Sequence, residues 1–195
     1  GEVMSYDEGA ANKIRGVKKV VIIPNGIAVI ADNTWRAKRG MEALNVKFNG
    51  GETKGLESKQ IKAELIKALD SEGKTSIEAF KVLDIEYEVP YLSQAALEPM
   101  NCTANVTENY CEVWVPTQFQ EACMDVAKEI SELDEEQIKI YTTYIGGGFG
   151  RRGETDFVKQ SLILSKELGK PVKVTWMREE DIQQGFYRPA SMSRF

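Results

Sequence analysis

A glycine-rich segment is the feature of this sequence best suited to binding chemistry. Gly146, Gly147, Gly148 and Gly150 lie within five residues. Glycine lets the backbone approach a ligand closely and adopt positive φ angles, so the segment predicts either a ligand-binding loop or a tight structural turn. The spacing from Gly148 through Gly150 to Gly153 also matches the GxGxxG pattern of dinucleotide-binding folds.

The dinucleotide interpretation has support and difficulties. Glu179 lies near the end of the next predicted strand, where a ribose-binding acid would be placed. However, Gly153 precedes the predicted helix, and Arg151 and Arg152 put two large cations where a diphosphate needs bare backbone. No Lys-Ser or Lys-Thr pair follows the glycines, which excludes a P-loop. A dinucleotide-binding oxidoreductase therefore stays an alternative, together with a non-catalytic binding module.

Several kinds of site are excluded by composition. The 195 residues contain no histidine, which removes Ser-His-Asp catalysis and HExxH zinc chemistry. Cys102, Cys111 and Cys123 lack CxxC spacing, so neither a zinc site nor an iron–sulfur cluster is indicated. We expect these cysteines to be small buried apolar side chains.

The overall composition is that of a folded globular chain. Hydrophobic residues make up 42% and charged residues 28%, and the net charge is −5. This mild acidity argues against nucleic acid as a partner. The longest nearly apolar run, Val20 to Ala31, is interrupted by Pro24 and is shorter than the roughly 18 residues that a membrane helix needs. We expect no membrane span in this segment.

The first part of the chain is predicted to contain short elements. Asp7 and Asn33 are expected to cap helices, the second running from Thr34 to Ala43 with Trp35 covering a sheet. Two β-branched runs flank Asn25-Gly26, a pair typical of a type I′ hairpin turn. Strands are predicted at 19–23, 27–31 and 44–48. An amphipathic helix is predicted at 58–69.

The second part predicts longer elements around the glycine-rich segment. A strand at 138–145 leads into the glycines, and a helix at 156–168 and a strand at 172–176 follow. The other predicted elements are strands at 82–89, 104–106 and 111–115 and a helix at 118–130. We therefore expect an α+β or α/β fold with mixed sheets and packed helices. The principal boundary is placed between residues 78 and 79.

Several motifs accompany the glycine-rich loop in a fixed order. They are AVIADNTWRA at 28–37, YEVPY at 87–91, LEPMNCTA at 97–104, WVPTQ at 114–118, GGGFGRR at 146–152, DFV at 156–158 and GKPVKV at 169–174. Together they resemble the large subunit of the molybdenum hydroxylases, the xanthine oxidase and aldehyde oxidoreductase family. The double arginine is most similar to the branch of isoquinoline 1-oxidoreductase beta subunits and bacterial aldehyde dehydrogenases.

The resemblance implies a domain organisation. Residues 1–78 would be the end of the α/β hammerhead domain with its connecting helix, and residues 79–195 the first part of the molybdopterin-cofactor-binding domain. The chain is accordingly expected to be a segment of a longer subunit. The family's catalytic glutamate would lie in another segment, so the isolated chain is expected to be inactive.

The resemblance also implies a site. Gln118 would donate from its amide to the molybdenum oxo group, although a helix-capping role is an alternative. The cofactor-binding residues would be Gly147, Gly148, Phe149, Gly150 and Arg151, with molybdenum held by the pterin and by no protein ligand. Arg151 could meet the cofactor's phosphate, a protein carboxylate or a surface ion-pair partner. Because they need a shared target, Gln118 and the Phe149-Gly150 pair should lie within one side chain's reach.

The implied activity is hydroxylation of an aldehyde or N-heterocycle carbon with water-derived oxygen. A partner subunit with iron–sulfur clusters would accept the electrons. Arg151-Arg152-Gly153 departs from the pattern of purine-oxidising relatives, in which a purine-binding glutamate follows. An aldehyde or N-heterocycle therefore fits better than a purine, and the sequence leaves open whether the compartment is the bacterial cytoplasm or periplasm.

Overall fold

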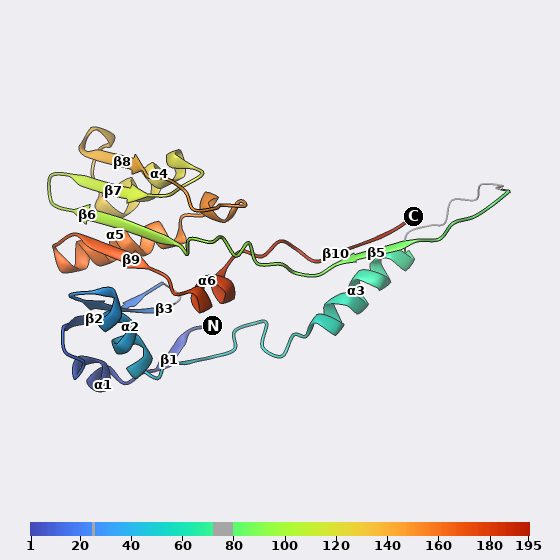
Figure 1. The fold of residues 1–195 in the computed structure, drawn as a ribbon, viewed down its shortest axis with the longest axis horizontal. Coiled ribbons are helices and arrows are strands. Elements are labelled where there is room, and N and C mark those ends of the chain that lie inside the picture. The colour runs from blue at the N-terminus through green and yellow to red at the C-terminus, as the bar shows by residue number, and fades with distance from the viewer. Residues whose placement is uncertain (25, 72–79) are drawn as a thin grey trace. The chain divides into compact units, whose positions relative to one another are not determined.

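The computed structural model describes residues 1–24, 26–71 and 80–195, and it divides into two compact units. Unit 1 comprises Gly1–Asn49 and Gln94–Gly185, and unit 2 comprises Gly50–Ser93 and Phe186–Phe195. Figure 1 shows the order of the elements. The boundary predicted between residues 78 and 79 lies outside the described residues and stays a prediction.

The centre of unit 1 is a mixed four-stranded sheet. Its spatial order is β8-β7-β6-β9, with β7 and β8 parallel and β6 antiparallel to both of its neighbours. The strands are β6 (Asn101–Val106), β7 (Cys111–Val115), β8 (Ile138–Thr142) and β9 (Val172–Thr175). The strands predicted at 104–106 and 111–115 are confirmed, and they form an antiparallel hairpin: Val106 pairs with Cys111, and the Thr107 hydroxyl donates to the Tyr110 carbonyl.

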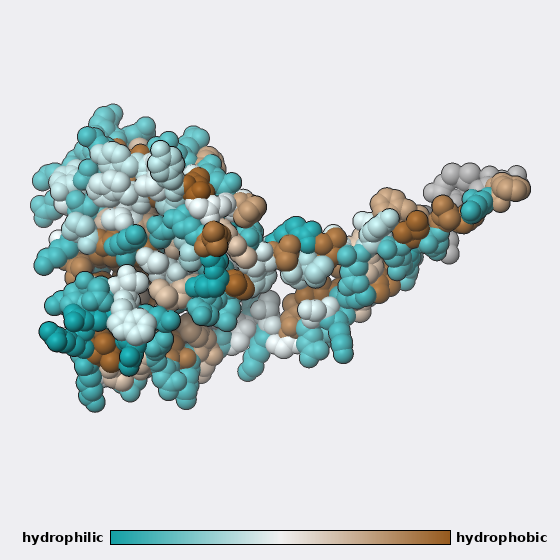
Figure 2. Space-filling view, viewed as in Figure 1, coloured by the Kyte–Doolittle hydropathy of each residue, from teal (hydrophilic) through white to brown (hydrophobic). Residues whose placement is uncertain are grey.

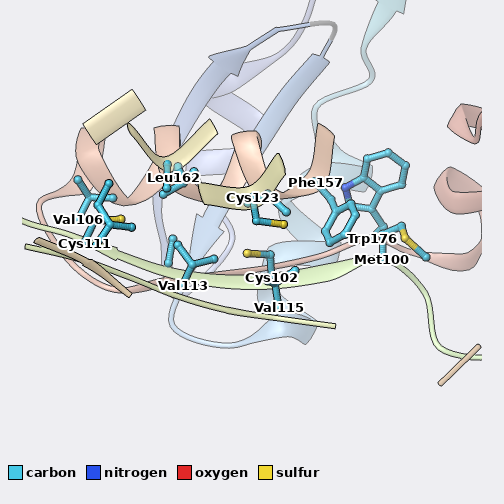
Figure 3. Close-up of a cluster of buried hydrophobic side chains, with 14 of the residues drawn as sticks. Met100, Cys102, Val106, Cys111, Val113, Val115, Cys123, Phe157, Leu162 and Trp176 are labelled. Carbon is cyan, nitrogen blue, oxygen red and sulfur yellow. The ribbon is translucent and has the colours of Figure 1, made fainter. Parts of the chain in front are cut away.

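The main core lies between this sheet and two helices, α4 (Gln120–Ser131) and α5 (Asp156–Leu168). Burial alternates along β6 and β7, so one face of each strand is buried. Figure 3 shows side chains of that face meeting Phe157 and Leu162 of α5. On β7 and β8, Trp114 stacks on Tyr141 with ring centroids 5.3 Å apart.

The three cysteines belong to this core. Each is free and buried, which confirms the prediction from their spacing. Burial raises the pKa of Cys102 to about 12 and that of Cys111 to about 11, and it also raises the pKa of Cys123. The thiols are therefore protonated at neutral pH and act as packing groups.

The N-terminal part of unit 1 is built from short elements. The predicted caps are confirmed: the Asp7 side chain accepts from the Ala10 N–H, and that of Asn33 from the Arg36 N–H. The strands β2 and β3 form the predicted antiparallel hairpin. The elements are β1 (Val3–Ser5), α1 (Glu8–Asn12), β2 (Val17–Ile23), β3 (Gly26–Ala31), α2 (Thr34–Ala43) and β4 (Lys47–Phe48).

Three local predictions are wrong in this part. Gly26 pairs with Ile23 and begins β3, so it is not at the turn centre, and Asn25 lies outside the described residues. Trp35 is 64% exposed; it is Gly40 that faces the hairpin, where an added Cβ would come within 2.8 Å of Val29. The close approach of helix and sheet therefore leaves no room for a large side chain.

The third difference concerns the strand predicted at 44–48. The structure restricts it to the two residues of β4, because Leu44 instead ends α2. Its backbone N–H donates to the Gly40 and Met41 carbonyls, and its side chain is fully buried. Burial of this leucine against the rest of unit 1 thus decides against an extended conformation.

Unit 2 consists of α3 (Ser58–Ser71) and an antiparallel ribbon of β5 (Glu86–Val89) and β10 (Ser191–Arg194). The predicted apolar face of α3 is half-buried, and no residue of the helix is fully buried. The strand predicted at 82–89 is shorter than expected, and Val82 and Leu83 are exposed. Figure 2 shows apolar side chains on the surface of this unit.

The predicted fold class is confirmed: the protein is an α+β molecule of several small sheets with packed helices. Among the described residues, no helix has the length and apolar character needed to traverse a membrane.

Candidate functional site

The topology of the four-stranded sheet brings distant segments to one edge. Strands β7, β8 and β9 run in the same direction, and β6 runs opposite to them. The segments after β7, β8 and β9 therefore meet the segment that precedes β6. These segments carry Gln118, the glycine-rich loop, Trp176 and Glu98, respectively.

Gln118 contacts the glycine-rich loop directly. Its Oε1 accepts a hydrogen bond from the Gly150 N–H at 3.1 Å, and its own backbone N–H donates to the Arg152 carbonyl at 3.1 Å. The Thr117 hydroxyl donates to the same carbonyl at 3.1 Å. The predicted proximity of Gln118 and the Phe149-Gly150 pair is thus confirmed.

This contact fixes how the Gln118 amide is oriented. A backbone N–H can only donate, so the oxygen must face Gly150 and the Nε2 group is the outward donor. Gln118 is exposed, and no acceptor in the described part of the chain bonds to its Nε2. The helix-capping alternative is wrong, because α4 has Phe119 at its N-cap position and begins at Gln120.

The loop has a backbone that favours glycine at particular places. Gly147, Phe149 and Gly150 have φ angles of +95°, +53° and +85°. A Cβ at Gly148 would lie 2.5 Å from the Gln118 Oε1, whereas a Cβ at Gly150 would meet nothing within 4 Å. Gly148 therefore makes room for Gln118, and Gly150 provides the backbone conformation beside open space.

Arg151 is buried behind the loop. Its guanidinium donates to both carboxylate oxygens of Asp156 at 2.9 and 2.7 Å and lies over the rings of Trp176 and Phe157. Of the partners considered for it, the structure shows a protein carboxylate. The alternative of a surface ion pair is wrong, because the side chain is 2% exposed.

Arg152 is the functional-site residue that sequence reasoning missed. It is fully buried, and its Nε donates to the Gly147 carbonyl at 2.7 Å. Its Nη2 donates to the Glu98 carbonyl at 2.7 Å and to Glu98 Oε2 at 2.9 Å, and its Nη1 donates to the Pro116 carbonyl at 3.4 Å. The signal in the sequence was the arginine pair beside the glycines, but spacing alone does not tell which arginine contacts the loop.

Glu98, in the segment that precedes β6, also bonds to the glycine-rich loop. Its Oε2 accepts from the Gly146 N–H at 2.9 Å, its Oε1 accepts from Asn101 Nδ2 at 2.9 Å, and its N–H donates to the Gly146 carbonyl. Burial opposes ionisation of this carboxyl, but the hydrogen bonds from Asn101 and Gly146 and the charge of Arg152 lower its pKa below the ordinary value.

Helix α6 (Arg178–Gln184) contacts the segment that carries Glu98. Arg178 donates to the Leu97 carbonyl at 2.7 Å and pairs with Asp181 at 3.1 Å. Burial raises the pKa of Asp181, against the opposing charges of Arg178, Arg151 and Arg152. Three arginines, Arg151, Arg152 and Arg178, are thus paired with three carboxylates behind the loop, those of Asp156, Glu98 and Asp181.

The loop fits an anionic cofactor better than a directly bound metal. In the described part of the chain, no cluster of three histidine, cysteine or acidic side chains could hold a metal ion. The N–H groups of Gly148 and Phe149 form no hydrogen bond within residues 1–24, 26–71 and 80–195. With the Gln118 amide they supply neutral donors beside open space at Gly150.

Comparison with known proteins identifies the family. Residues 60–194 match the family model described as the molybdopterin cofactor-binding domain. The chain belongs to this family. The molybdopterin-domain chain is also 28% identical, over 99% of its length, to the membrane-bound aldehyde dehydrogenase [pyrroloquinoline-quinone] of Gluconacetobacter polyoxogenes. It is 26% identical, over 96% of its length, to isoquinoline 1-oxidoreductase subunit beta of Brevundimonas diminuta.

The matched regions are only part of these relatives: the chain spans 28% and 27% of their respective lengths. Solved structures show the same fold. Reconstituted CO dehydrogenase from Oligotropha carboxidovorans has a TM-score of 0.66 at 17% identity, with 92% of this chain and 30% of that chain covered. Aldehyde oxidoreductase from Desulfovibrio gigas has a TM-score of 0.66 at 13% identity, with 95% and 26% covered.

The dinucleotide-binding alternative is not supported by either the family or the topology. In the sheet, β8 and β9 lie at opposite edges with β7 and the antiparallel β6 between them, whereas a dinucleotide fold has an open, mostly parallel sheet. Glu179 lies within α6 and not at a strand end. The GxGxxG spacing thus arises in a loop whose inner side is occupied by two arginine side chains.

Proposed function

We propose that this molybdopterin-domain chain contributes one wall of the cofactor site in an oxidoreductase that hydroxylates an aldehyde or N-heterocycle carbon with water-derived oxygen. The observation that carries the proposal is the hydrogen bond from Gly150 to Gln118, which fixes an amide donor beside an open glycine-rich loop. When bound, the molybdenum cofactor supplies the two-electron redox chemistry. The names of two relatives, an aldehyde dehydrogenase and isoquinoline 1-oxidoreductase, support this substrate class.

Each site residue has a distinct role in the proposal. Gln118 orients a neutral Nε2 donor toward the cofactor, which suits a site beside an oxo group because it adds no charge. Gly147 and Gly148 give the backbone clearance, and the Gly148 and Phe149 N–H groups face the anionic pterin. Since the Gly150 N–H is used by Gln118, its own part is to orient that side chain.

Arg151 acts indirectly in this proposal. Its guanidinium is engaged by Asp156 of α5 and lies over the Trp176 ring, so it anchors the turn after the glycines to α5 and does not itself contact the cofactor. The family's catalytic glutamate is expected outside this chain. We also propose an iron–sulfur partner subunit, because relatives such as isoquinoline 1-oxidoreductase and nicotinate dehydrogenase are described as subunits.

The test is analysis of metal and cofactor content together with turnover of the whole protein that contains this chain. We expect molybdenum and a pterin at equal molar amounts. The name of one relative includes pyrroloquinoline quinone, so that quinone is assayed in parallel. Finding the quinone in place of molybdenum would contradict the proposal.

The Gln118→Ala variant separates an effect on turnover from an effect on molybdenum content. We expect it to keep its molybdenum while turnover falls by an amount equivalent to about 3 to 4 kcal/mol in the barrier, the typical loss for one preorganised donor. Gln120→Ala is the matched control, because among the described residues that exposed side chain bonds only to the Ile140 carbonyl. Full activity of Gln118→Ala, or loss of metal equal to that in a loop variant, would refute the assigned role.

The loop variant is Gly150→Val. A branched side chain resists the φ angle of +85° found at this position, and it would enter the open space beside the loop. We expect molybdenum content to fall. Normal molybdenum content in this variant would show that the cofactor does not approach the loop here.

A further inference from the structure

Arg152 connects the two sides of the candidate site. We propose that Arg152 is a positioning residue that sets the distance between the Gln118 side chain and the glycine-rich loop. This inference rests on the proposed function, since it concerns the same site. It assigns to a buried arginine a task that neither its position in the sequence nor the family match describes.

Arg152 bonds to the loop and to Gln118 through different groups. Its side-chain Nε holds the Gly147 carbonyl at 2.7 Å, while its backbone carbonyl accepts from the Gln118 N–H and the Thr117 hydroxyl. The Gln118 Oε1 then bonds to Gly150, at the other end of the short Gly147–Gly150 segment. The loop is thus fixed at one end by Arg152 and at the other by the glutamine whose backbone Arg152 holds.

The guanidinium of Arg152 links three segments of the chain. Its three nitrogens bond to three separate segments: Nε to Gly147, Nη1 to Pro116 and Nη2 to Glu98. A lysine has one nitrogen and cannot reach all three at these distances. Arg152→Lys therefore keeps the positive charge and removes the spacing function.

The Glu98 carboxylate bonds to both Arg152 and the loop. Glu98 Oε2 accepts from Arg152 Nη2 and from the Gly146 N–H, both at 2.9 Å. The cation and the anion thus hold neighbouring residues of the loop, the carbonyl of Gly147 and the N–H of Gly146. Weakening either charge should release the same segment.

Arg151 provides a matched control within the same turn. It is adjacent in sequence and equally buried, and its guanidinium also pairs with a carboxylate, that of Asp156. Its pairing is directed toward α5 and the Trp176 ring. Arg151→Lys and Arg152→Lys should therefore share any general loss of stability from replacing a buried arginine. An effect on the position of the loop should appear in Arg152→Lys alone.

The experiment is hydrogen–deuterium exchange by mass spectrometry on the whole protein, freed of cofactor, with a peptide covering residues 143–150. This peptide contains the loop but neither arginine, so its mass is the same in both variants. The exchange rates are corrected for differences in global stability, which urea unfolding measures. We then expect Arg152→Lys to speed exchange of the peptide by about tenfold, which corresponds to the loss of one hydrogen bond to a charged group. Arg151→Lys should speed it by less than about threefold.

Equal acceleration in the two variants, or none in Arg152→Lys, would overturn the inference. If Arg152→Lys does not fold, Glu98→Gln carries the test, because this side chain is 35% exposed and its amide keeps an acceptor oxygen. We expect Glu98→Gln to speed exchange of the peptide by about threefold, and no change would overturn the inference. Cofactor content is measured separately, so failure of the proposed function remains distinguishable from failure of this positioning role.

Discussion

The two units of the molecule are stabilised in different ways. In unit 1, the core between the four-stranded sheet and helices α4 and α5 contains fully buried side chains such as Phe157 and Leu162. In unit 2, α3 has no buried residue, and ion pairs such as Lys62–Glu88 and Arg194–Asp70 join it to the ribbon. The candidate site lies on the unit with the packed core, which can hold donors in fixed positions.

The polar contacts differ in the same way. Arg151 and Arg152 are buried and form ion pairs with partly buried carboxylates, whereas both members of the Lys62–Glu88 pair are about half exposed. Buried charge pairs are sensitive to loss of one partner, while exposed pairs are screened by salt and contribute little. Substitutions should therefore affect the two units unequally.

The largest expected difference is between two leucine substitutions. Leu162→Ala removes a fully buried side chain from unit 1 and should lower the free energy of unfolding by about 3 to 5 kcal/mol. Leu65→Ala removes a half-buried side chain from α3 in unit 2 and should cost about 1 kcal/mol. Urea unfolding, combined with hydrogen exchange of peptides from each unit, measures both. Equal costs would show that unit 2 buries Leu65 as fully as unit 1 buries Leu162.

The next effect tests how the loop accommodates Gln118. In Gly148→Ala the new Cβ would displace the flexible end of the Gln118 side chain, so stability should fall by only about 1 kcal/mol as one hydrogen bond is lost. Cofactor-dependent turnover should fall much further. Gly153→Ala is the control, because a Cβ there meets nothing within 4 Å. A Gly148→Ala variant with normal turnover would show that the Gln118–Gly150 contact is dispensable.

A smaller effect is expected from acid. The pKa of Glu98 is lowered in the folded state, so its ionisation stabilises the loop above the unfolded pKa, and this stabilisation is lost as pH falls through the folded pKa. Exchange of the peptide 143–150 should therefore accelerate below about pH 4.5 in the wild type, relative to the intrinsic rate. In Glu98→Gln this acceleration should be absent, and its persistence would assign the acid sensitivity to another group.

The smallest expected effect is that of salt on unit 2. Arg194 donates to Asp70 and Glu86, and these hydrogen bonds raise its pKa, but the pairs are exposed to solvent. Raising NaCl to 1 M should slightly accelerate exchange in peptides from β5 and β10 and leave peptides from β6 and β7 unchanged. A larger salt effect on the four-stranded sheet than on the ribbon would reverse the comparison of the two units.

The sequence by itself determined much of the local structure. Helix α5 begins and ends as predicted because apolar residues recur at helical spacing and Gly169 adopts the left-handed conformation that ends it. The caps at Asp7 and Asn33 could also be predicted from the sequence, because each side chain bonds to a backbone N–H only three residues later. The ordered motifs also indicated the family, which the match over residues 60–194 confirms.

Tertiary structure decided what these local patterns do not contain. The sequence shows two adjacent arginines, but the partners of Arg151 and Arg152 come from different segments, α5 for one and the loop and Glu98 for the other. Likewise, Gly40 of α2 faces the hairpin in place of the expected Trp35, because the distance between helix and hairpin admits no large side chain. Such outcomes depend on strand order and on the space between packed elements, which local sequence patterns do not specify. The contact between Arg152 and Glu98, for example, joins residues 54 positions apart.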